Sequence, residues 1–308
     1  MEYIDEIISL KEQIAFDGKI NIENNFENIV VAGMGGSGIA GNIFSQMYSK
    51  KPVHVIRSYE IPEFVDRSTL FIALSYSGNT EETITAVKRA KENGASIAAV
   101  TTGGKLAEIV ENTVLIPSGF QPRSAVGFLT MPLLNAFDLV LKEDVIETIH
   151  ELENIDNNTK EFESIASVLL AGNKVPFILG TPDTEAISYR WKTQFNENSK
   201  ILAFNSNFPE LNHNETMPFR MSYRRDEFHF FVLTTRFTQD IIKKRIELTS
   251  KLCGLKFQSI SGRGHSYLSN LFTLIHIGDY ISYFLGKERG IDPRNVSIIE
   301  ELKRDLNS

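Results

Sequence analysis

Residues 71–83 read FIALSYSGNTEET, an apolar run that stops at a cluster of small hydroxyl residues and a glycine. A continuous apolar run is typical of a strand that is buried on both faces of a parallel sheet. Thr80 is a natural N-cap for a helix that Gly94 would end. The stretch therefore predicts a buried strand that leads through a hydroxyl-rich loop into a helix.

The same succession of elements recurs along the first half of the chain. We expect apolar strands at 29–33, 53–58, 69–75, 96–102 and 112–119, with helices between most of them. Strands that alternate with helices predict a doubly wound parallel sheet with helices on both faces. An apolar helical segment follows within 120–151, and the polar stretch after it marks the expected domain boundary.

The second half of the chain repeats this pattern. We expect strands at 175–180, 200–206, 228–235 and 254–261, and a long apolar helix at 266–286. From Gly33 to Val53 there are 20 residues, and from Gly180 to Lys200 there are again 20. The sequence thus predicts an α/β protein of two similar domains, 1–150 and 151–308, each a doubly wound, flavodoxin-like parallel sheet.

Composition limits the classes of function. A net charge of −7 over 308 residues gives no broad affinity for nucleic acid or for an anionic membrane. The single cysteine, Cys253, excludes an intrachain disulfide framework and fits a reducing cytoplasm. The acidic first residues carry no long apolar core, and no apolar run reaches the roughly 18 residues of a membrane span. We therefore expect a cytoplasmic protein without a signal peptide or a membrane anchor.

The loop GMGGSG, residues 33–38, follows the first predicted strand and matches the G-x-G-x-x-G pattern of dinucleotide-binding loops. The acidic residue that such loops require at the end of the next strand is missing, because that strand ends at Arg57 and Ser58. Ser37 and the hydroxyls after residue 74 suit a single phosphate group, which helix N-termini also favour. We predict a phosphate site. The alternatives are plain turn chemistry and a dehydrogenase, which would bind NAD(P).

Three further side chains are candidates for chemistry on a sugar. Arg123, in a loop after the fifth predicted strand, could balance charge on a substrate oxygen. Glu197, near a predicted helix end, could move a proton between adjacent carbons, and His213, in a polar loop, could open a sugar ring. The structural alternatives are a surface arginine, a helix-end carboxylate and a surface histidine.

The remaining histidines give no metal-binding pattern. His265, in GRGHS, competes with His213 for a role in catalysis, whereas His54 and His276 lie in apolar segments and are expected in the core. No spacing among the histidines suggests a zinc site, so we expect no metal and no cofactor.

Seven ordered segments carry a resemblance to a known family. They are GMGGSG (33–38), LSYSGNTEET (74–83), TTGG (101–104), PRSAVG (122–127), FNENSK (195–200), ELNHNE (210–215) and IDPRNVSIIEELK (291–303). In this order, and over nearly the whole chain, they resemble the bifunctional phosphoglucose/phosphomannose isomerases of archaea and some bacteria. The SYSGNTEET segment is shared by many sugar isomerase domains, whereas PRSAVG and ELNHNE are more specific.

The resemblance implies two sugar isomerase domains in a homodimer that interconverts glucose 6-phosphate or mannose 6-phosphate with fructose 6-phosphate, without a metal. It implies that Glu197 shuttles a proton through a cis-enediol, that Arg123 stabilises the enediolate, and that His213 of a partner subunit opens the ring. Lys303 would assist this opening. The phosphate-binding residues that it implies are Gly35, Gly36, Ser37, Ser75, Ser77 and Thr80.

One position departs from the family pattern. A small hydroxyl residue, associated with room for the mannose epimer, is expected one helix-length before Lys303, but counting back reaches Val296, between Asn295 and Ser297. The resemblance therefore implies the glucose activity more directly than the mannose activity.

Two alternatives share the same type of domain. A non-catalytic phosphosugar sensor would need an effector domain, for which the first 25 residues are too few and too acidic. The isomerase half of a glucosamine-6-phosphate synthase would need an N-terminal glutaminase with a nucleophilic cysteine, and Cys253 lies far from the N-terminus. Tight binding of fructose 6-phosphate without turnover would favour the sensor.

Overall fold

A computed structural model describes residues 2–22 and 26–306, with the exception of the Lys303 side chain. The chain forms two compact units: residues 8–149 make the first unit, and residues 1–7 together with 150–308 make the second. The first seven residues therefore join the second half of the chain, which the expected domains at 1–150 and 151–308 did not anticipate.

The first unit contains a five-stranded sheet of order β2-β1-β3-β4-β5 in which every pairing is parallel. The strands are β1 (Asn28–Ala32), β2 (Val53–Ile56), β3 (Thr69–Leu74), β4 (Ser96–Thr101) and β5 (Thr113–Leu115). This order is that of a flavodoxin-like fold and confirms the predicted fold class. All six residues of β3 are buried, as its unbroken apolar run indicated.

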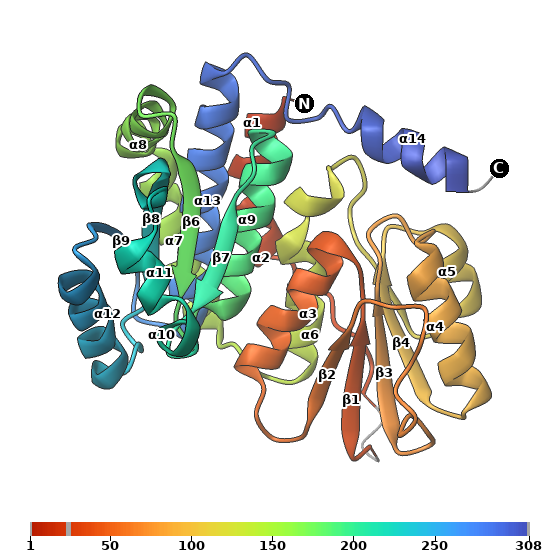
Figure 1. The fold of residues 1–308 in the computed structure, drawn as a ribbon. Coiled ribbons are helices and arrows are strands. Elements are labelled where there is room, and N and C mark those ends of the chain that lie inside the picture. Colours follow the sequence, from red (N-terminus) through yellow and green to blue (C-terminus); the bar gives the residue numbers. More distant parts are fainter. Residues whose placement is uncertain (1, 23–25, 307–308) are drawn as a thin grey trace. The chain divides into compact units, whose positions relative to one another are not determined.

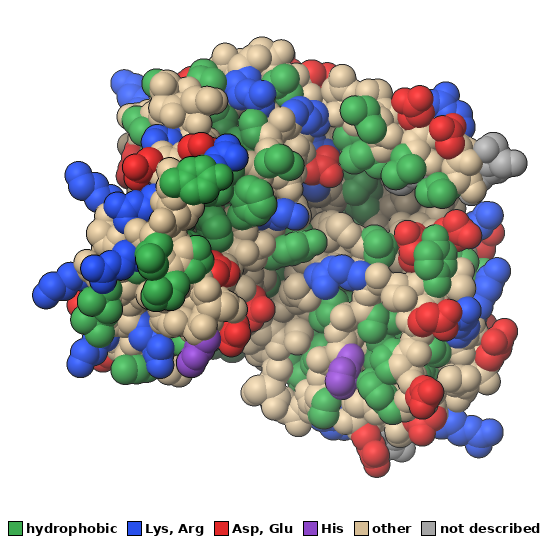
Figure 2. Space-filling model, viewed as in Figure 1, with side chains coloured by type: hydrophobic (Ala, Val, Ile, Leu, Met, Phe, Trp, Pro, Cys, Tyr) green, Lys and Arg blue, Asp and Glu red, His purple; other side chains and the backbone are tan. Residues whose placement is uncertain are grey.

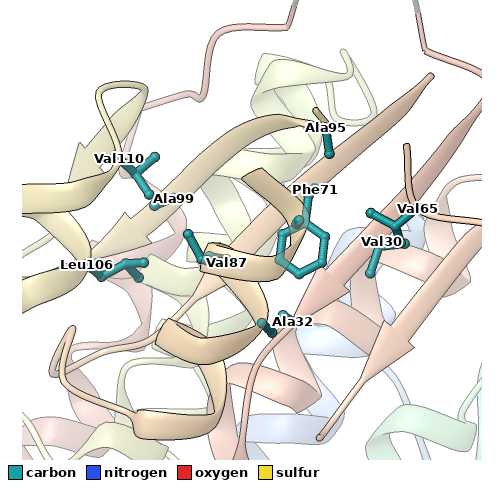
Figure 3. Close-up of a cluster of buried hydrophobic side chains, with 12 residues drawn as sticks. Val30, Ala32, Val65, Phe71, Val87, Ala95, Ala99, Leu106 and Val110 are labelled. Atoms are coloured by element: carbon teal, nitrogen blue, oxygen red, sulfur yellow. The ribbon is translucent and has the colours of Figure 1, made fainter. Parts of the chain in front are cut away.

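Helices cover both faces of this sheet (Figure 1). They are α2 (Leu10–Ile14), α3 (Gly35–Met47), α4 (Glu81–Glu92), α5 (Gly104–Ile109) and α6 (Val126–Ala136), with the 3-10 turn η1 (Pro122–Ser124) before α6. Val30 and Phe71 point to one face, where they pack with Val87 of α4 and Leu106 of α5 (Figure 3). Val31 points to the other face, where it meets α3 at Gly41. Successive residues of β1 thus bury opposite faces of the sheet.

The second unit contains a four-stranded parallel sheet of order β7-β6-β8-β9. Its strands are β6 (Val175–Gly180), β7 (Phe204–Asn207), β8 (Phe228–Thr234) and β9 (Phe257–Ser261). Its helices are α1 (Tyr3–Ile8), α8 (Lys160–Ala171), α9 (Glu185–Asn198), α10 (Leu211–Asn214), α11 (Thr216–Met221), α12 (Asp240–Cys253), α13 (Tyr267–Glu288) and α14 (Ser297–Leu306), with the 3-10 turn η2 at Arg225–Glu227. Helix α7 (Lys142–Asp156) contains the division between the two units, which falls after residue 149. The strand order of the second unit matches the first four strands of the other sheet, so the predicted repeat is present in the topology.

The long helix α13 forms the centre of the second unit and is buried over most of its length. Polar groups on it are paired within the core: Asp279 accepts hydrogen bonds at 2.7 Å from Arg190 and at 2.8 Å from Gln194. His276 is fully buried, as predicted, and its Nε2 lies 2.7 Å from the Asp156 carboxylate. No described helix is long and apolar enough to cross a membrane.

The two N-terminal helices, α1 and α2, are divided between the units. Tyr3 stacks on Tyr283, and the Glu6 carboxylate accepts a 2.5 Å hydrogen bond from Arg294, so both side chains pack within the second unit. Gln13 and Ile14, on α2, are buried in the first unit. The break at Ser9 separates the two helices.

Several sequence expectations were wrong in detail. The strand expected at 200–206 begins only at Phe204, because α9 continues to Asn198 and Lys200 takes a left-handed conformation with φ of +52°. The equal spacing of the two halves is therefore lost. The strand expected at 112–119 is confined to Thr113–Leu115. His54 is exposed on the edge strand β2, where its ring packs on Phe64, and does not lie in the core.

Candidate active site

The hydroxyl-rich loop after β3 is built around Ser75, which is only 1% exposed. Its Oγ lies 2.8 Å from Oγ1 of Thr80 and accepts the N–H of Gly78 at 3.1 Å. Thr80 is the N-cap residue of α4, as predicted, but its side chain makes no capping bond within the described chain. The two hydroxyls bond each other instead, and Ser77 stands exposed beside them with its Oγ accepting the N–H of Asn79.

Glycine is required at the turn of this loop. Gly78 has φ of +66°, and a Cβ on it would lie 1.8 Å from the carbonyl oxygen of Gly103. A residue with a side chain would therefore be strained twice, by its backbone conformation and by this contact. The TTGG segment at the end of β4 therefore packs against the hydroxyl loop, and Thr102 Oγ1 donates a hydrogen bond to the Tyr76 carbonyl at 2.8 Å.

The GMGGSG loop lies directly beside the hydroxyl loop. A Cβ on Gly33 would come within 3.0 Å of both the Leu74 carbonyl oxygen and Cβ of Ser37. Gly35 opens α3 with φ of +51° and faces open space. Two loops from neighbouring strands of one sheet thus meet at its carboxyl edge, where doubly wound proteins bind their ligands.

Arg123 reaches the same edge of the sheet from the 3-10 turn η1. A Cβ on Gly36 would lie 3.1 Å from Cα of Arg123, so the turn packs against the GMGGSG loop. The arginine is 9% exposed, and its guanidinium donates to Oε1 of Gln121 at 3.2 Å. The structure therefore brings together the first three predicted elements of the site within one unit.

Gln13 holds the Arg123 segment, and the sequence analysis did not single it out. This fully buried side chain donates to the Ser124 carbonyl at 2.8 Å and accepts the Gly127 N–H at 2.9 Å. Its amide thereby bridges the two sides of the turn that carries Arg123. A glutamine among the apolar residues of this N-terminal segment, between Leu10 and Ile14, was the signal that could have found it, because buried polar groups need partners.

Glu197 lies in the second unit, one residue before the end of α9, and lines a cavity of about 420 Å³. The other lining residues are Asn196, Lys200, Asn295, Val296, Ser297, Ile298 and Ile299. Lys200 turns back to donate to the Glu197 carbonyl at 2.5 Å and the Pro293 carbonyl at 3.3 Å. The left-handed Lys200 therefore ties the end of α9 to the segment before α14. Val296, at the position of the expected hydroxyl residue, shares this cavity with Glu197.

His213 and Lys303 are not among the residues that line the cavity beside Glu197. His213 is exposed on the short helix α10, and Lys303 lies on α14, where its side chain is outside the described part of the structure. His265, its competitor, is also exposed and contacts Arg236. Over residues 2–22 and 26–306, no group of three or more His, Cys, Asp or Glu side chains is placed to hold a metal ion.

Comparison with known proteins identifies the domain types and the family. Residues 24–129 match the SIS domain, and residues 158–306 match the bacterial phospho-glucose isomerase C-terminal SIS domain. The bifunctional phosphoglucose/phosphomannose isomerase of Thermoplasma acidophilum is 51% identical over 307 residues, covering 100% of this chain and 98% of that protein. The chain belongs to this family. A second member, from Aquifex aeolicus, is 35% identical over 91% of both chains.

Membership of this isomerase family confirms the predicted resemblance. Solved structures with much lower identity share the fold. The C-terminal domain of glucosamine-fructose-6-phosphate aminotransferase from Francisella tularensis is 15% identical, with a TM-score of 0.74 over 96% of this chain and 98% of that chain. A protein from Bacillus subtilis named as a putative phosphosugar isomerase is 16% identical, with a TM-score of 0.70 over 94% of both chains.

Proposed function

We propose that this isomerase interconverts glucose 6-phosphate and mannose 6-phosphate with fructose 6-phosphate by a metal-independent route through a cis-enediol. The observation that carries the proposal is the full-length match to relatives that bear these two activities in their name. The phosphate group is the part of the substrate for which the structure offers the clearest binding site.

The proposed phosphate site is the junction of the GMGGSG and hydroxyl loops. The hydroxyls of Ser37, Ser75, Ser77 and Thr80 supply donors, together with the backbone N–H groups of Gly35 and Gly36. The open space at Gly35 lets a ligand approach the backbone closely. A phosphate held here would act as a remote handle, so that binding energy aligns the first two carbons of the sugar with the base.

Glu197 is the proposed base. It would take the proton from C2 of the aldose and return it to C1, while the proton of the C2 hydroxyl passes to the C1 oxygen, so that the aldose becomes the ketose without any net oxidation. The intermediate carries negative charge on an oxygen, and the Arg123 guanidinium would stabilise that charge. His213 and Lys303 are proposed to open the ring before this step by proton transfer to and from the ring oxygen and the anomeric hydroxyl.

The test replaces the base without changing its shape. In Glu197→Gln we expect kcat to fall by roughly 10²- to 10⁴-fold while KM for fructose 6-phosphate changes little. Glu185→Gln is the matched control, because Glu185 is an exposed carboxylate at the other end of the same helix. Assays contain a chelator and separate the two aldose products. Unchanged turnover in Glu197→Gln would contradict the assignment, and binding without any turnover in the unmodified protein would favour a sensor.

A second copy of the chain is the proposed partner. Five large apolar side chains that lie close to His213 in sequence are exposed, namely Leu202, Phe204, Met217, Met221 and Tyr223. Hydrophobic and cationic groups stand side by side on the surface of this unit (Figure 2). Exposed apolar side chains of this kind favour an interaction surface, and a two-fold dimer is the commonest assembly. His213, which is also exposed, is proposed to act in the partner's active site.

Mixing two inactive variants tests this arrangement. If the base and His213 of one active site come from different subunits, Glu197→Gln and His213→Ala homodimers are both impaired. Subunit exchange then regenerates one intact site in each heterodimer, and about a quarter of full activity returns by random pairing. If activity does not return while native mass spectrometry shows a mixed dimer, His213 does not act across the interface.

The proposed location is the cytoplasm. Cys253 is a free, buried thiol, and burial raises its pKa, with nearby arginines opposing this in part. A reduced and unreactive cysteine is consistent with a reducing compartment.

A further inference from the structure

The second unit contains a loop that corresponds to the hydroxyl loop of the first. Thr235 directly follows β8 as Ser75 directly follows β3, and both strands hold the same place in their sheets. In both loops the amide three residues later bonds back to this residue: the Gly78 N–H to the Ser75 carbonyl at 3.1 Å, and the Thr238 N–H to the Thr235 carbonyl at 3.2 Å. The second unit thus has its own pair of hydroxyls, on Thr235 and Thr238, at the carboxyl edge of the sheet.

These two hydroxyls are bonded to a carboxylate. The Thr238 Oγ1 donates to Oδ2 of Asp183 at 2.7 Å, and the Thr235 Oγ1 donates to the same oxygen. Both threonines are only 2% exposed. One carboxylate oxygen therefore receives two buried hydroxyl donors, which is the bonding that an oxygen of a bound phosphate would receive.

A longer loop carries Asp183 to this place. Between β6, which ends at Gly180, and α9, which begins at Glu185, there are four residues, whereas only two separate β1 from α3. The longer loop is fixed by its own bonds, since the Thr181 N–H donates to Oγ1 of Thr184 at 2.8 Å and the Tyr267 hydroxyl donates to the Asp183 carbonyl at 2.9 Å. The aspartate is thus held over the end of the neighbouring strand.

Two cationic residues start from the same edge of the sheet, because Arg236 follows β8 and Arg263 follows β9. The Arg263 guanidinium lies over the ring of Phe162. Arg236 is exposed and contacts the ring of His265. The Phe237 N–H donates to the Thr235 Oγ1 at 3.0 Å, so the backbone of this loop helps to point the hydroxyl outward toward its acceptor.

We propose that Asp183 is a built-in anion that fills an oxyanion-binding cradle formed by Thr235 and Thr238. In this view the second unit retains the layout of a phosphate site, and its own carboxylate closes that site to phosphate. Removal of the carboxylate would open a second binding site for a phosphate dianion. The parallel with the first unit rests on the proposed function, but the cradle itself rests on the contacts of Asp183.

Equilibrium dialysis with labelled inorganic phosphate tests the proposal by counting sites per chain. Asp183→Ala should bind one more phosphate than the unmodified protein, and the added Thr238→Val substitution should remove the extra site. The number of phosphates bound by the unmodified protein tests the proposed phosphate site of the first unit. The difference in this number between Asp183→Ala and the unmodified protein tests the role of Asp183, so the two proposals can fail separately. A folded Asp183→Ala protein with an unchanged count would overturn the inference, and so would a site in the unmodified protein that Thr238→Val removes.

A second measurement tests the proposal if Asp183→Ala does not fold in the absence of phosphate. If Asp183→Ala is recovered unfolded, refolding is compared in phosphate and in chloride of equal ionic strength, with the isosteric Asp183→Asn as control. Recovery in phosphate alone supports the cradle, because phosphate then replaces the missing carboxylate. Failure in both salts while Asp183→Asn refolds would overturn the inference.

Discussion

Replacement of Gln13 by leucine tests whether one buried amide positions Arg123. Leucine has nearly the same volume, so the change removes hydrogen bonds and leaves little cavity. It deprives the Ser124 carbonyl and the Gly127 N–H of partners that lie at 2.8 and 2.9 Å. Each buried backbone group left without a partner costs about 1–3 kcal/mol. We expect the two together to destabilise the turn by about 2–4 kcal/mol, since water can reach part of it.

Hydrogen exchange measures the loss of local stability in Gln13→Leu, and enzyme kinetics measures the displacement of Arg123. Exchange of peptides that cover residues 121–130 should accelerate by roughly 30-fold or more, because 1.4 kcal/mol corresponds to a factor of about ten. Displacement of the Arg123 guanidinium should lower kcat by roughly 10- to 100-fold, with a smaller effect on KM. The exposed Gln239, which makes no capping bond within the described chain, gives the control Gln239→Leu, expected within about 0.5 kcal/mol of the unmodified protein. Faster exchange with unchanged kcat would refute the positioning role, and unchanged exchange would refute the hydrogen-bond argument itself.

Three further substitutions test other parts of the structure. Ser75→Ala removes a hydroxyl that bonds Thr80 and Gly78, so KM for fructose 6-phosphate in initial-rate assays should rise by roughly 10- to 100-fold, and a purely kcat effect would contradict a phosphate role. Gly78→Ala adds a Cβ at 1.8 Å from the Gly103 carbonyl at a left-handed position, which should cost about 2–5 kcal/mol in chemical unfolding; a loss below about 1 kcal/mol would show that the loop adapts easily. Burial raises the pKa of Glu215, and a hydrogen bond from Ser206 opposes this in part. Because the pKa of this carboxyl is higher in the folded than in the unfolded state, the folded protein loses stability as pH rises from the unfolded pKa through the folded pKa. Glu215→Gln should therefore raise the melting temperature at neutral pH, and this gain should disappear in acid. A gain in melting temperature that grows in acid would contradict the argument.

Much of the fold followed from local patterns in the sequence. The buried strand β3 gave a clear signal because both of its faces are covered, so every residue in it is apolar. The edge strands were harder. Their residues face solvent in part, and the turn at Lys200 depends on a lysine that bonds the nearby Glu197 carbonyl and the distant Pro293 carbonyl. No propensity rule predicts a left-handed lysine, because one of these contacts comes from a residue far along the chain.

The candidate site divides in the same way. The two loops at the carboxyl edge of the first sheet could be expected to meet, because their strands are neighbours in a doubly wound order. The clamp on Arg123 by Gln13 could not be located, since the two residues are more than a hundred positions apart in sequence. Asp183 was hidden for another reason: its loop differs in length from its counterpart, and only the structure shows that the extra residues reach the next strand.

The membership of residues 1–7 in the second unit has a consequence for biosynthesis. Tyr3 and Glu6 leave the ribosome long before their partners Tyr283 and Arg294 have been made. The first unit can complete its sheet once residue 149 has emerged, whereas α1 must wait for these later residues before it can pack. Packing of α1 is therefore a late step for the nascent chain, and an affinity tag placed beside this helix would affect the unit that folds later.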